Sequence, residues 1–173
     1  KTDAIPYRTR PYPIPHSHMD VFKQELDRLV QIGVLERTGR QEWIAGTFII
    51  PKKDASVRWI SDFRGLNRAL KRAVYHLPRI GDILKRRKDY KYVTKLDISM
   101  QYYTFELDEE SSNLCTIATP FGLYRYKRLP MGISCSPDIS QEIMETVLCG
   151  IDGVESYLDD ISLFSNSWEE HME

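Results

Sequence analysis

The apolar residues of the first third predict one amphipathic helix after an extended start. A capping-box pattern begins at Ser17, and apolar residues then recur three and four positions apart until Gly33. Four of the nine prolines lie within residues 1–16. Because proline fixes φ and has no N–H to donate, we expect an extended proline-rich arm on the surface there.

Short runs of β-branched and aromatic residues predict strands along the rest of the chain. These strands are expected at residues 43–50, 57–61, 92–98, 114–118, 123–128, 154–158 and 161–164. Helices are expected from residue 80 and after Ser136, where serine followed by proline is typical of a helix start. Helices and strands mix without regular βαβ alternation, so the predicted fold class is α+β.

Composition places the chain among ordinary globular proteins. It has 173 residues, of which 42% are hydrophobic and 11% aromatic, enough for a buried core. Cys115, Cys135 and Cys149 have no zinc-ligand spacing, so we interpret them as reduced core residues of an intracellular protein. No apolar run is long enough for a membrane span, and no membrane partner is predicted.

Charge is strongly polarised along the chain. Residues 52–95 contain 14 Lys or Arg against 4 Asp or Glu, whereas residues 138–173 contain 10 acidic residues and no Lys or Arg. A basic stretch with interleaved aromatic residues is suited to a phosphate-rich partner, although a solvated charged surface is the alternative.

Two adjacent aspartates carry the strongest chemical signal. Asp159 and Asp160 separate two apolar strands, where like charges repel and a glycine-containing turn would be expected. A divalent cation would relieve this repulsion, and carboxylate oxygens suit Mg²⁺ or Mn²⁺. Asp97 ends the strand in which Tyr92 and Leu96 are predicted to face the core, and it faces away from that buried side. If that strand lies beside the hairpin, three carboxylates converge, enough for two metal ions; an ordinary capped strand end is the alternative.

Tyr157-Leu158-Asp159-Asp160 lies between two apolar strands, and Leu96-Asp97-Ile98 ends an earlier strand. The first segment resembles the Tyr-x-Asp-Asp signature of reverse transcriptases, and the second resembles the strand with their other catalytic carboxylate. The resemblance is strongest to the polymerases of retroviruses and gypsy-like long-terminal-repeat retrotransposons. The motifs that fall in family order are Lys52-Lys53-Asp54, Arg58, Asp62-Phe63-Arg64-Gly65-Leu66-Asn67, Leu77-Pro78-Arg79-Ile80, Leu96-Asp97, Thr119-Pro120-Phe121-Gly122-Leu123-Tyr124 and Leu129-Pro130-Met131-Gly132.

The resemblance implies the fingers and palm of a right-hand polymerase, with an antiparallel palm sheet packed on helices. After the arm at residues 1–16, residues 17–91 would be mainly fingers. Residues 92–173 would be mainly palm, with residues 114–130 belonging to the fingers. The thumb, connection and RNase H domains are not expected in this chain, so we expect it to extend primers weakly or not at all.

The resemblance also implies roles for individual residues. The metal ligands would be Asp97, Asp159 and Asp160, which are also the catalytic residues, with the main-chain carbonyl of Ile98. The nucleotide-binding residues would be Lys52, Lys53, Arg58, Tyr102 and Met131. The nucleic-acid-binding residues would be Arg64, Arg79, Gly132 and Tyr157. Tyr102 would reject a ribose 2′-hydroxyl, and Tyr103 competes for that role. Met131 stands where many relatives have Gln or Phe, and Ser140 where the family commonly has Phe before Gln141.

The implied activity is RNA-directed DNA polymerase, a nucleotidyltransferase that adds deoxynucleotides to a primer 3′-hydroxyl with two Mg²⁺ or Mn²⁺ ions. The implied partners are an RNA or DNA template with its primer, dNTPs and the rest of a Pol polyprotein. We expect it in cytoplasmic virus-like particles, or in the nucleus, and not secreted. Two alternatives stay open: a catalytically silent domesticated nucleic-acid-binding domain, and the palm of an RNA-dependent RNA polymerase.

Overall fold

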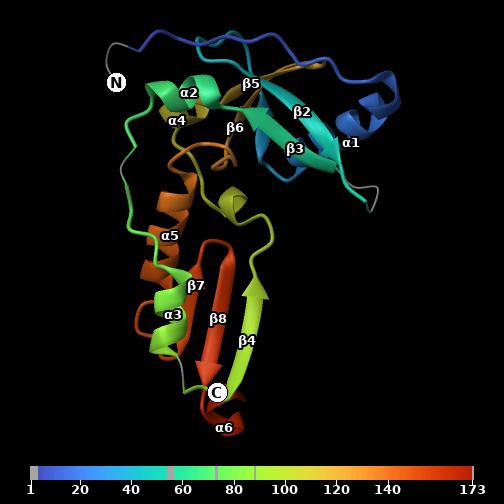
Figure 1. Cartoon of the computed structure of the whole chain (residues 1–173). Coiled ribbons are helices and arrows are strands. Elements are labelled where there is room, and N and C mark those ends of the chain that lie inside the picture. Colours follow the sequence, from blue (N-terminus) through green and yellow to red (C-terminus); the bar gives the residue numbers. More distant parts are fainter. Residues whose placement is uncertain (1–3, 54–56, 73, 88, 173) are drawn as a thin grey trace. The chain divides into compact units, whose positions relative to one another are not determined.

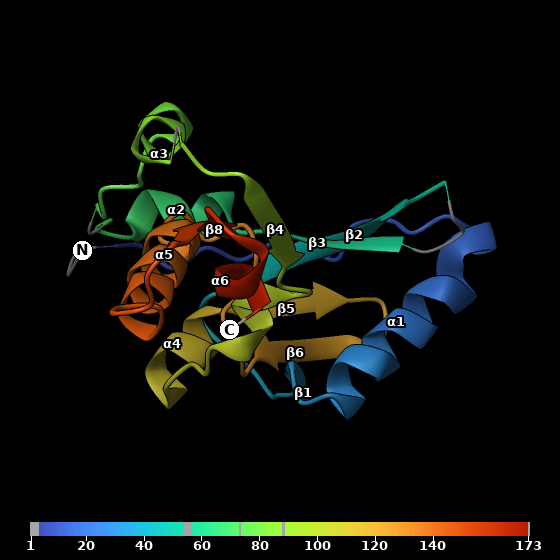
Figure 2. The same cartoon turned by 90° about the horizontal axis from the view of Figure 1, so that it is seen from below.

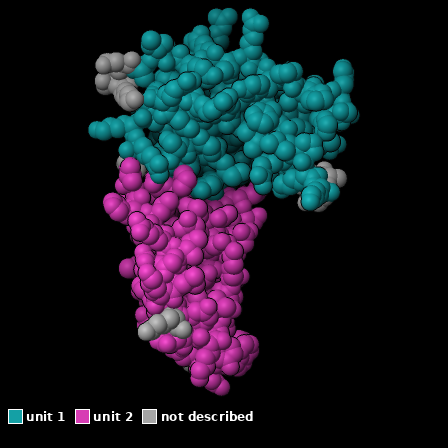
Figure 3. Space-filling model, viewed as in Figure 1, with its two compact units in different colours: residues 1–72, 102–136 teal, residues 73–101, 137–173 magenta. Residues whose placement is uncertain are grey.

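The computed structural model describes residues 4–53, 57–72, 74–87 and 89–172, which form two compact units (Figures 1 and 3). Unit 1 comprises residues 1–72 and 102–136, and unit 2 comprises residues 73–101 and 137–173. The elements in chain order are η1 (His16–His18), α1 (Met19–Gln31), β1 (Leu35–Arg37), β2 (Ala45–Pro51), β3 (Val57–Asp62), α2 (Arg64–Ala69), α3 (Ile80–Arg86), β4 (Tyr92–Asp97), η2 (Gln101–Thr104), α4 (Glu109–Leu114), β5 (Thr116–Thr119), β6 (Gly122–Tyr126), α5 (Ser136–Val147), β7 (Val154–Tyr157), β8 (Asp160–Ser165) and α6 (Trp168–Met172).

Unit 1 is built on a five-stranded sheet in the order β1-β6-β5-β2-β3. The pairs β2–β3 and β5–β6 are antiparallel hairpins, formed by the strands that the sequence predicts at residues 43–50 with 57–61 and at residues 114–118 with 123–128. β2 and β5 pair in parallel, with Ala45 opposite Ile117. This parallel pairing joins strands that are far apart in the sequence, so the strand pattern alone does not predict it.

Helix α1 lies against this sheet and closes the core of unit 1 (Figure 2). Phe22 of α1 is fully buried, and its ring centroid lies 4.7 Å from that of Trp59 on β3. The indole N–H of Trp59 donates to the hydroxyl of Tyr126, 3.1 Å away, so the two large buried aromatic residues have polar partners. The amphipathic pattern of the sequence therefore predicts the correct buried face of α1.

In the described part of the proline-rich arm, residues 4–15 run extended along unit 1, and His16 begins η1. The amide of Ile44 donates to the carbonyl of Tyr7 at 2.8 Å, and the amide of Thr9 donates to the carbonyl of Ile44 at 2.9 Å. The ring of Tyr7 packs against Gly65 of α2, where a Cβ would overlap it. Backbone pairing and this close approach fix the path of the arm.

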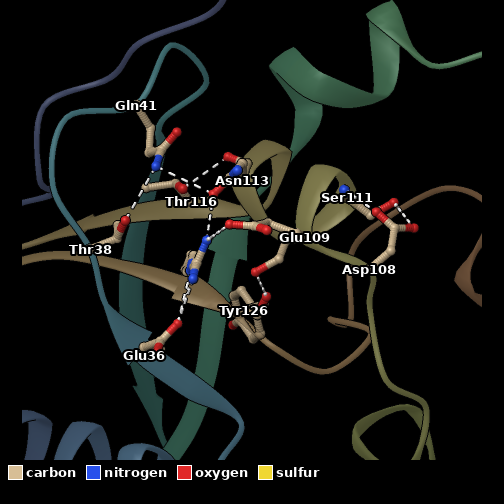
Figure 4. Close-up of polar contacts among 11 residues, drawn as sticks. Glu36, Thr38, Gln41, Asp108, Glu109, Ser111, Asn113, Thr116 and Tyr126 are labelled. Carbon is tan, nitrogen blue, oxygen red and sulfur yellow. Dashed lines mark hydrogen bonds and ion pairs between the residues drawn. The ribbon is translucent and has the colours of Figure 1, made fainter.

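A polar network joins β1, α4 and β6 at one edge of unit 1 (Figure 4). Arg125 donates to Glu36 on β1 at 2.9 Å and to the side chain of Asn113 at 2.8 Å. The amide of Gln41 lies 3.3 Å from the same Asn113 oxygen. Asp108 caps the N-terminus of α4 by accepting from the amide of Ser111 at 2.7 Å.

Unit 2 contains a three-stranded antiparallel sheet in the order β4-β8-β7, as the sequence predicts for its last strands. Helices α3 and α5 are tied to β7. Arg86 and Arg87, at the end of α3, both pair with Glu155 of β7, at 2.7 and 3.1 Å. Gln141 of α5 donates to the carbonyl of Ser156 on β7 at 3.0 Å.

The exposure of β4 differs from the prediction. Tyr92 and Leu96 are 37% and 55% exposed, and Val93 on the opposite face is 52% exposed. β4 pairs only with β8, so it is an edge strand, and the described residues cover neither face fully. The predicted buried face is therefore wrong, because alternation reports which residues share a face and not what covers it.

The helix predicted at Ser136 is present: α5 begins at this residue, and the Ser136 hydroxyl donates to the carbonyl of Pro130 at 2.8 Å. Two other local predictions are wrong. The side chain of Ser17 does not cap α1: the helix begins at Met19, and the Ser17 hydroxyl lies 3.2 Å from Nδ1 of His18. Cys149 is exposed and so is not a core residue, whereas Cys115 is buried and Cys135 half-buried; within the described residues, none of the three forms a disulfide.

Among the residues that the structure describes, none of the helices has the length and apolar character needed to cross a membrane.

The contact between Gly65 and Tyr7 predicts a compensating pair of variants. Gly65→Ala should lower the free energy of unfolding by about 1–3 kcal/mol, because the added methyl group overlaps the Tyr7 ring. In a Tyr7→Ala background the same change should be neutral or stabilising, since alanine favours the helix by about 1 kcal/mol. Urea unfolding of the four proteins tests this, and equal costs of Gly65→Ala in both backgrounds would contradict it.

Candidate active site

A tight turn joins β7 to β8 and carries the first two aspartates. Tyr157 pairs with Asp160 across the hairpin, so the two turn residues are Leu158 and Asp159. The sequence predicted Asp159 and Asp160 as the turn pair, which is one residue too far along the chain. Asp160 instead begins β8, and the two adjacent carboxylates therefore sit in different backbone environments.

The third aspartate comes to the same end of the sheet. Asp97, the last residue of β4, lies directly opposite Asp160 in the antiparallel register. The amide of Ile98 then donates to the carbonyl of Asp159 at 2.8 Å, which extends the pairing beyond the strand. The strand with Asp97 does lie beside the hairpin, and the backbone brings all three aspartates together.

The side chains of these aspartates do not form a closed cluster. Asp97 and Asp159 are exposed, and one oxygen of Asp160 lies 2.9 Å from the ammonium of Lys95 on β4. Within the described ranges, no three His, Cys, Asp or Glu side chains are close enough together to form a metal-binding group. The predicted convergence therefore holds for the backbone and not for the carboxylates, because like charges repel and Asp160 pairs with the nearest cation.

Lys95 is a member of this site that the sequence analysis missed. Its hydrogen bond and charge interaction with Asp160, with weaker contributions from Asp97 and Asp159, raise the pKa of Lys95. Lys95 and Asp97 are two residues apart in a strand, so they share a face. That spacing could have indicated the pairing. The oxygen donors nevertheless fit a hard divalent cation, and Asp97, Asp159 and Asp160 are the residues that would hold it.

Two other predicted residues belong to unit 2. Arg79 is exposed and directly precedes α3. Tyr157 ends β7 and is half-buried, one residue before the turn. Each keeps its predicted role as a hypothesis.

In unit 1, the predicted nucleotide-binding cations lie on the β2–β3 hairpin. Lys52 and Lys53 directly follow β2 and are exposed. Arg58 of β3 is exposed and pairs across the sheet with Ile50. Asp54, which the motif includes, lies outside the described residues. The hairpin thus presents a cationic end to solvent.

Met131 and Gly132 lie in a loop of unit 1 that is hydrogen-bonded to Asn67. The side chain of Asn67 donates to the carbonyl of Gly132 at 2.8 Å and accepts from the amide of Ser134 at 2.9 Å. Gly132 has φ of +93°, which favours glycine, and Met131 is 47% exposed. Asn67 is therefore an architectural residue whose partner was not identifiable from the sequence.

Tyr102 and Tyr103 have different surroundings. Tyr103 packs on the core of unit 1, with its ring centroid 6.2 Å from that of Tyr126. Burial raises the pKa of Tyr103. Tyr102 is half-buried in η2. Of the two residues that compete for the sugar-facing role, Tyr103 already serves as a core residue, which favours Tyr102.

A groove of about 510 Å³ lies on unit 1 between the arm and β2. It is lined by aromatic, proline and basic side chains, including Tyr12, Phe48 and Arg64. Asp62 holds the side chains of Arg64 and Tyr12. It accepts two hydrogen bonds from the guanidinium of Arg64, at 2.7 and 2.8 Å, and one from the hydroxyl of Tyr12 at 2.7 Å. Arg64 is held in place while its side chain stays largely exposed.

Comparison with known families assigns the chain. A family model described as reverse transcriptase (RNA-dependent DNA polymerase) matches residues 50–173. The chain belongs to the reverse transcriptase family. Similarity to individual relatives also covers the residues before residue 50. The predicted resemblance to reverse transcriptases is confirmed.

Two curated relatives cover nearly the whole chain. An uncharacterized protein of Caenorhabditis elegans is 36% identical over 172 residues, which are 98% of this chain and 14% of that protein. The retrovirus-related Pol polyprotein from transposon 412 of Drosophila melanogaster is 30% identical over 178 residues, which are 98% of this chain and 14% of the polyprotein. The chain thus spans about a seventh of the length of these relatives.

Solved reverse transcriptases share its fold. Prototype foamy virus protease-reverse transcriptase, in the crystal structure of a CSH mutant, matches with a TM-score of 0.89 and 26% identity, over 98% of this chain and 23% of the viral one. The foamy viral enzyme in complex with an RNA/DNA hybrid matches with a TM-score of 0.88 and 23% identity, over 98% of this chain and 23% of that one, which shows the fold alone. The predicted α+β fold of reverse transcriptase fingers and palm is confirmed.

The buried carboxylate of Asp62 predicts a pH-dependent contribution to stability. Hydrogen bonds from Arg64 hold the pKa of Asp62 well below its usual range, against the effect of burial. A depressed pKa stabilises the folded state above the carboxyl's unfolded pKa of about 4, and this stabilisation is lost as the pH falls through the folded value. Asp62→Asn should therefore cost about 1 kcal/mol at pH 7 and progressively less below about pH 4.

Denaturant unfolding followed by tryptophan fluorescence between pH 7 and pH 3 measures this difference. Asp152→Asn, at an exposed position, is the matched control and should show no such trend. A cost of Asp62→Asn that stays constant across the range would contradict the prediction.

Proposed function

We propose that this chain supplies the fingers and palm of an RNA-directed DNA polymerase that adds deoxynucleotides to a primer 3′-hydroxyl. The observation that carries the proposal is the register of β4, β8 and β7, which brings Asp97, Asp159 and Asp160 to one end of one sheet. The proposed fingers are mainly residues 17–91 with residues 114–130, and the proposed palm is mainly the rest of residues 92–173. The two compact units divide the chain differently: residues 73–91 fall in unit 2, and residues 102–113 and 131–136 fall in unit 1.

In this proposal the three carboxylates hold two Mg²⁺ or Mn²⁺ ions, with the carbonyl of Ile98 as a further ligand. When bound, such ions lower the pKa of the attacking hydroxyl and stabilise the departing pyrophosphate. The chain's own contribution is to fix the backbone that carries the ligands: antiparallel pairing sets Asp97 against Asp160, and the hydrogen bond between the backbones of Ile98 and Asp159 holds the turn. Lys95 pairs with Asp160 and offsets its charge.

Unit 1 would bind the nucleotide through charge and shape. The exposed Lys52, Lys53 and Arg58 suit a triphosphate, because ammonium and guanidinium groups stabilise phosphate charge. Met131 has no hydrogen-bonding amide, so it would make apolar contact with the nucleotide. Tyr102 would pack under the sugar and exclude a 2′-hydroxyl.

The groove of unit 1 suits a nucleic acid strand. Bases stack on aromatic side chains such as Tyr12 and Phe48, and the Arg64 guanidinium can contact phosphate or base. Foamy viral enzymes of the same fold have been solved in complex with an RNA/DNA hybrid and with double-stranded DNA. Gly132, Arg79 and Tyr157 would contribute to template or primer binding. The remaining partner would be the rest of the Pol polyprotein, in cytoplasmic particles or the nucleus.

Primer extension tests the proposal directly. In a polymerase that carries this chain within its Pol polyprotein, Mg²⁺ or Mn²⁺ should support extension of a DNA primer on an RNA template. Asp159→Asn should lower the rate at least about 100-fold, because it removes a charged metal ligand. Asp152→Asn, an exposed aspartate seven residues earlier, should leave the rate unchanged.

Two outcomes favour the alternatives. Binding of an RNA/DNA hybrid without extension by the wild-type polymerase would favour a silent nucleic-acid-binding domain. A preference for ribonucleotides over deoxyribonucleotides would favour an RNA-dependent RNA polymerase.

Sugar selection gives an independent test at Tyr102. Tyr102→Ala should raise the ratio of kcat/KM for ribonucleotides to that for deoxyribonucleotides at least about 10-fold, because the smaller side chain leaves room for the 2′-hydroxyl. Tyr103→Leu removes the other ring while keeping an apolar side chain against the core, and it should leave the ratio unchanged. A shift in the Tyr103 variant alone would assign the role to that residue.

A further inference from the structure

The turn between β7 and β8 contains an unfavourable backbone conformation. Leu158 has φ of +54°, one of two positive values among the described non-glycine residues. A two-residue hairpin turn with positive φ at its first position usually has glycine there, because a side chain in this region is strained. Leucine persists in such a conformation only when its surroundings hold it.

A buried glutamine of α5 holds this turn. Gln141 is fully buried, and its side-chain oxygen accepts a hydrogen bond of 2.8 Å from the amide of Leu158. Its side-chain nitrogen donates to the carbonyl of Ser156 at 3.0 Å and lies 3.2 Å from the hydroxyl of the same residue. One side chain thus contacts the strand before the turn and the first residue of the turn.

The amide of Gln141 has a defined orientation. Its nitrogen also donates to Glu145, one turn further along α5, at 2.8 Å, and Glu145 in turn accepts from the hydroxyl of Tyr75. Because the carboxylate of Glu145 only accepts, the nitrogen of Gln141 must face it and the oxygen must face Leu158. A flipped amide would place an acceptor against the Ser156 carbonyl and a donor against the Leu158 amide.

We propose that Gln141 is a positioning residue of the active site, which holds the backbone of Leu158 and thereby the direction in which Asp159 leaves the turn. Asp159 directly follows Leu158, and its carbonyl accepts from Ile98, so the turn is held by Gln141 on one side and by the strand end of Asp97 on the other. Residues that orient metal ligands typically change activity or metal affinity 10- to 100-fold when replaced. The inference rests on the proposed function, because it assigns Asp159 as a metal ligand.

A purely structural role for Gln141, tying α5 to β7, makes a different prediction. Loss of that tie would lower the melting temperature and the fraction of active protein without changing the properties of the active fraction. Loss of turn positioning changes metal binding and kcat in fully folded protein. The two roles are therefore separated by measurements on folded protein.

The test compares Gln141→Met with two neighbouring variants in the full polymerase. Methionine has a similar length and keeps the buried volume, but it makes none of the four polar contacts. Ser140→Ala is the matched control, since Ser140 is equally buried on the same helix and its hydroxyl has no hydrogen-bond partner within the described part of the chain. Ser156→Ala removes the contact of Gln141 with that hydroxyl and leaves the bond to Leu158 in place.

We expect Gln141→Met to lower kcat about 10- to 100-fold while KM for the dNTP changes less than about threefold. The Mn²⁺ dissociation constant, measured by calorimetry without substrate, should rise by a similar factor. Ser140→Ala and Ser156→Ala should stay within about twofold of wild type in all three quantities. Circular dichroism melting identifies the folded fraction, and Gln141→Asn, whose side chain is too short to reach Leu158, replaces the methionine variant if that one does not fold.

Unchanged kcat and Mn²⁺ binding in folded Gln141→Met would overturn the inference. So would a loss of kcat and Mn²⁺ affinity in Ser156→Ala as large as that in Gln141→Met. An inactive wild-type polymerase would refute the proposed function instead. In that case the Mn²⁺ constants still decide: weaker binding by the Gln141 variant supports positioning, and equal binding overturns it.

Discussion

The antiparallel register between β4 and β8 is the constraint on which the active site depends. It places Asp97 opposite Asp160, and the hydrogen bond from Ile98 to Asp159 continues the same register into the turn. A slip of one residue would move every side chain of β4 to the other face of the sheet. The acidic end of unit 2 therefore exists only in one pairing, and pairs such as Tyr92 with Ser165 at the far end of the same strands belong to that pairing.

The sequence predicted the elements with local signals and missed those set by distant partners. The helix at α1 and the hairpins β2–β3, β5–β6 and β7–β8 follow from periodicity and turn residues, and all are present. The parallel pairing of β2 with β5, and the pairing of the short strand β1 with β6, join residues that are far apart in the chain. No local pattern reports such partners.

The same distinction holds for the active site: residues with a local signal were predictable, and residues brought in by distant contacts were not. The three aspartates were identifiable because adjacent carboxylates at a turn oppose local folding preferences, and motif order then gave the family. Their exact environments were not predictable. The turn residues are Leu158 and Asp159, not Asp159 and Asp160. Lys95 contacts Asp160 from the neighbouring strand, and Gln141 contacts Leu158 from helix α5. A buried glutamine has no sequence pattern that distinguishes it from an exposed one, because its partners are backbone groups brought close only by the fold.

The exposed β4 strand has a practical consequence for handling this protein. An edge strand with exposed Val93 and Leu96 offers unpaired backbone groups and apolar side chains to a second copy of itself. The formal net charge is only −1 at pH 7, so repulsion between molecules is weak. Lys91 and Lys95 are charged residues of the kind that protects such edges. We therefore expect the solubility of the isolated chain to depend on these two lysines, and expression to improve when more charge is added beside them.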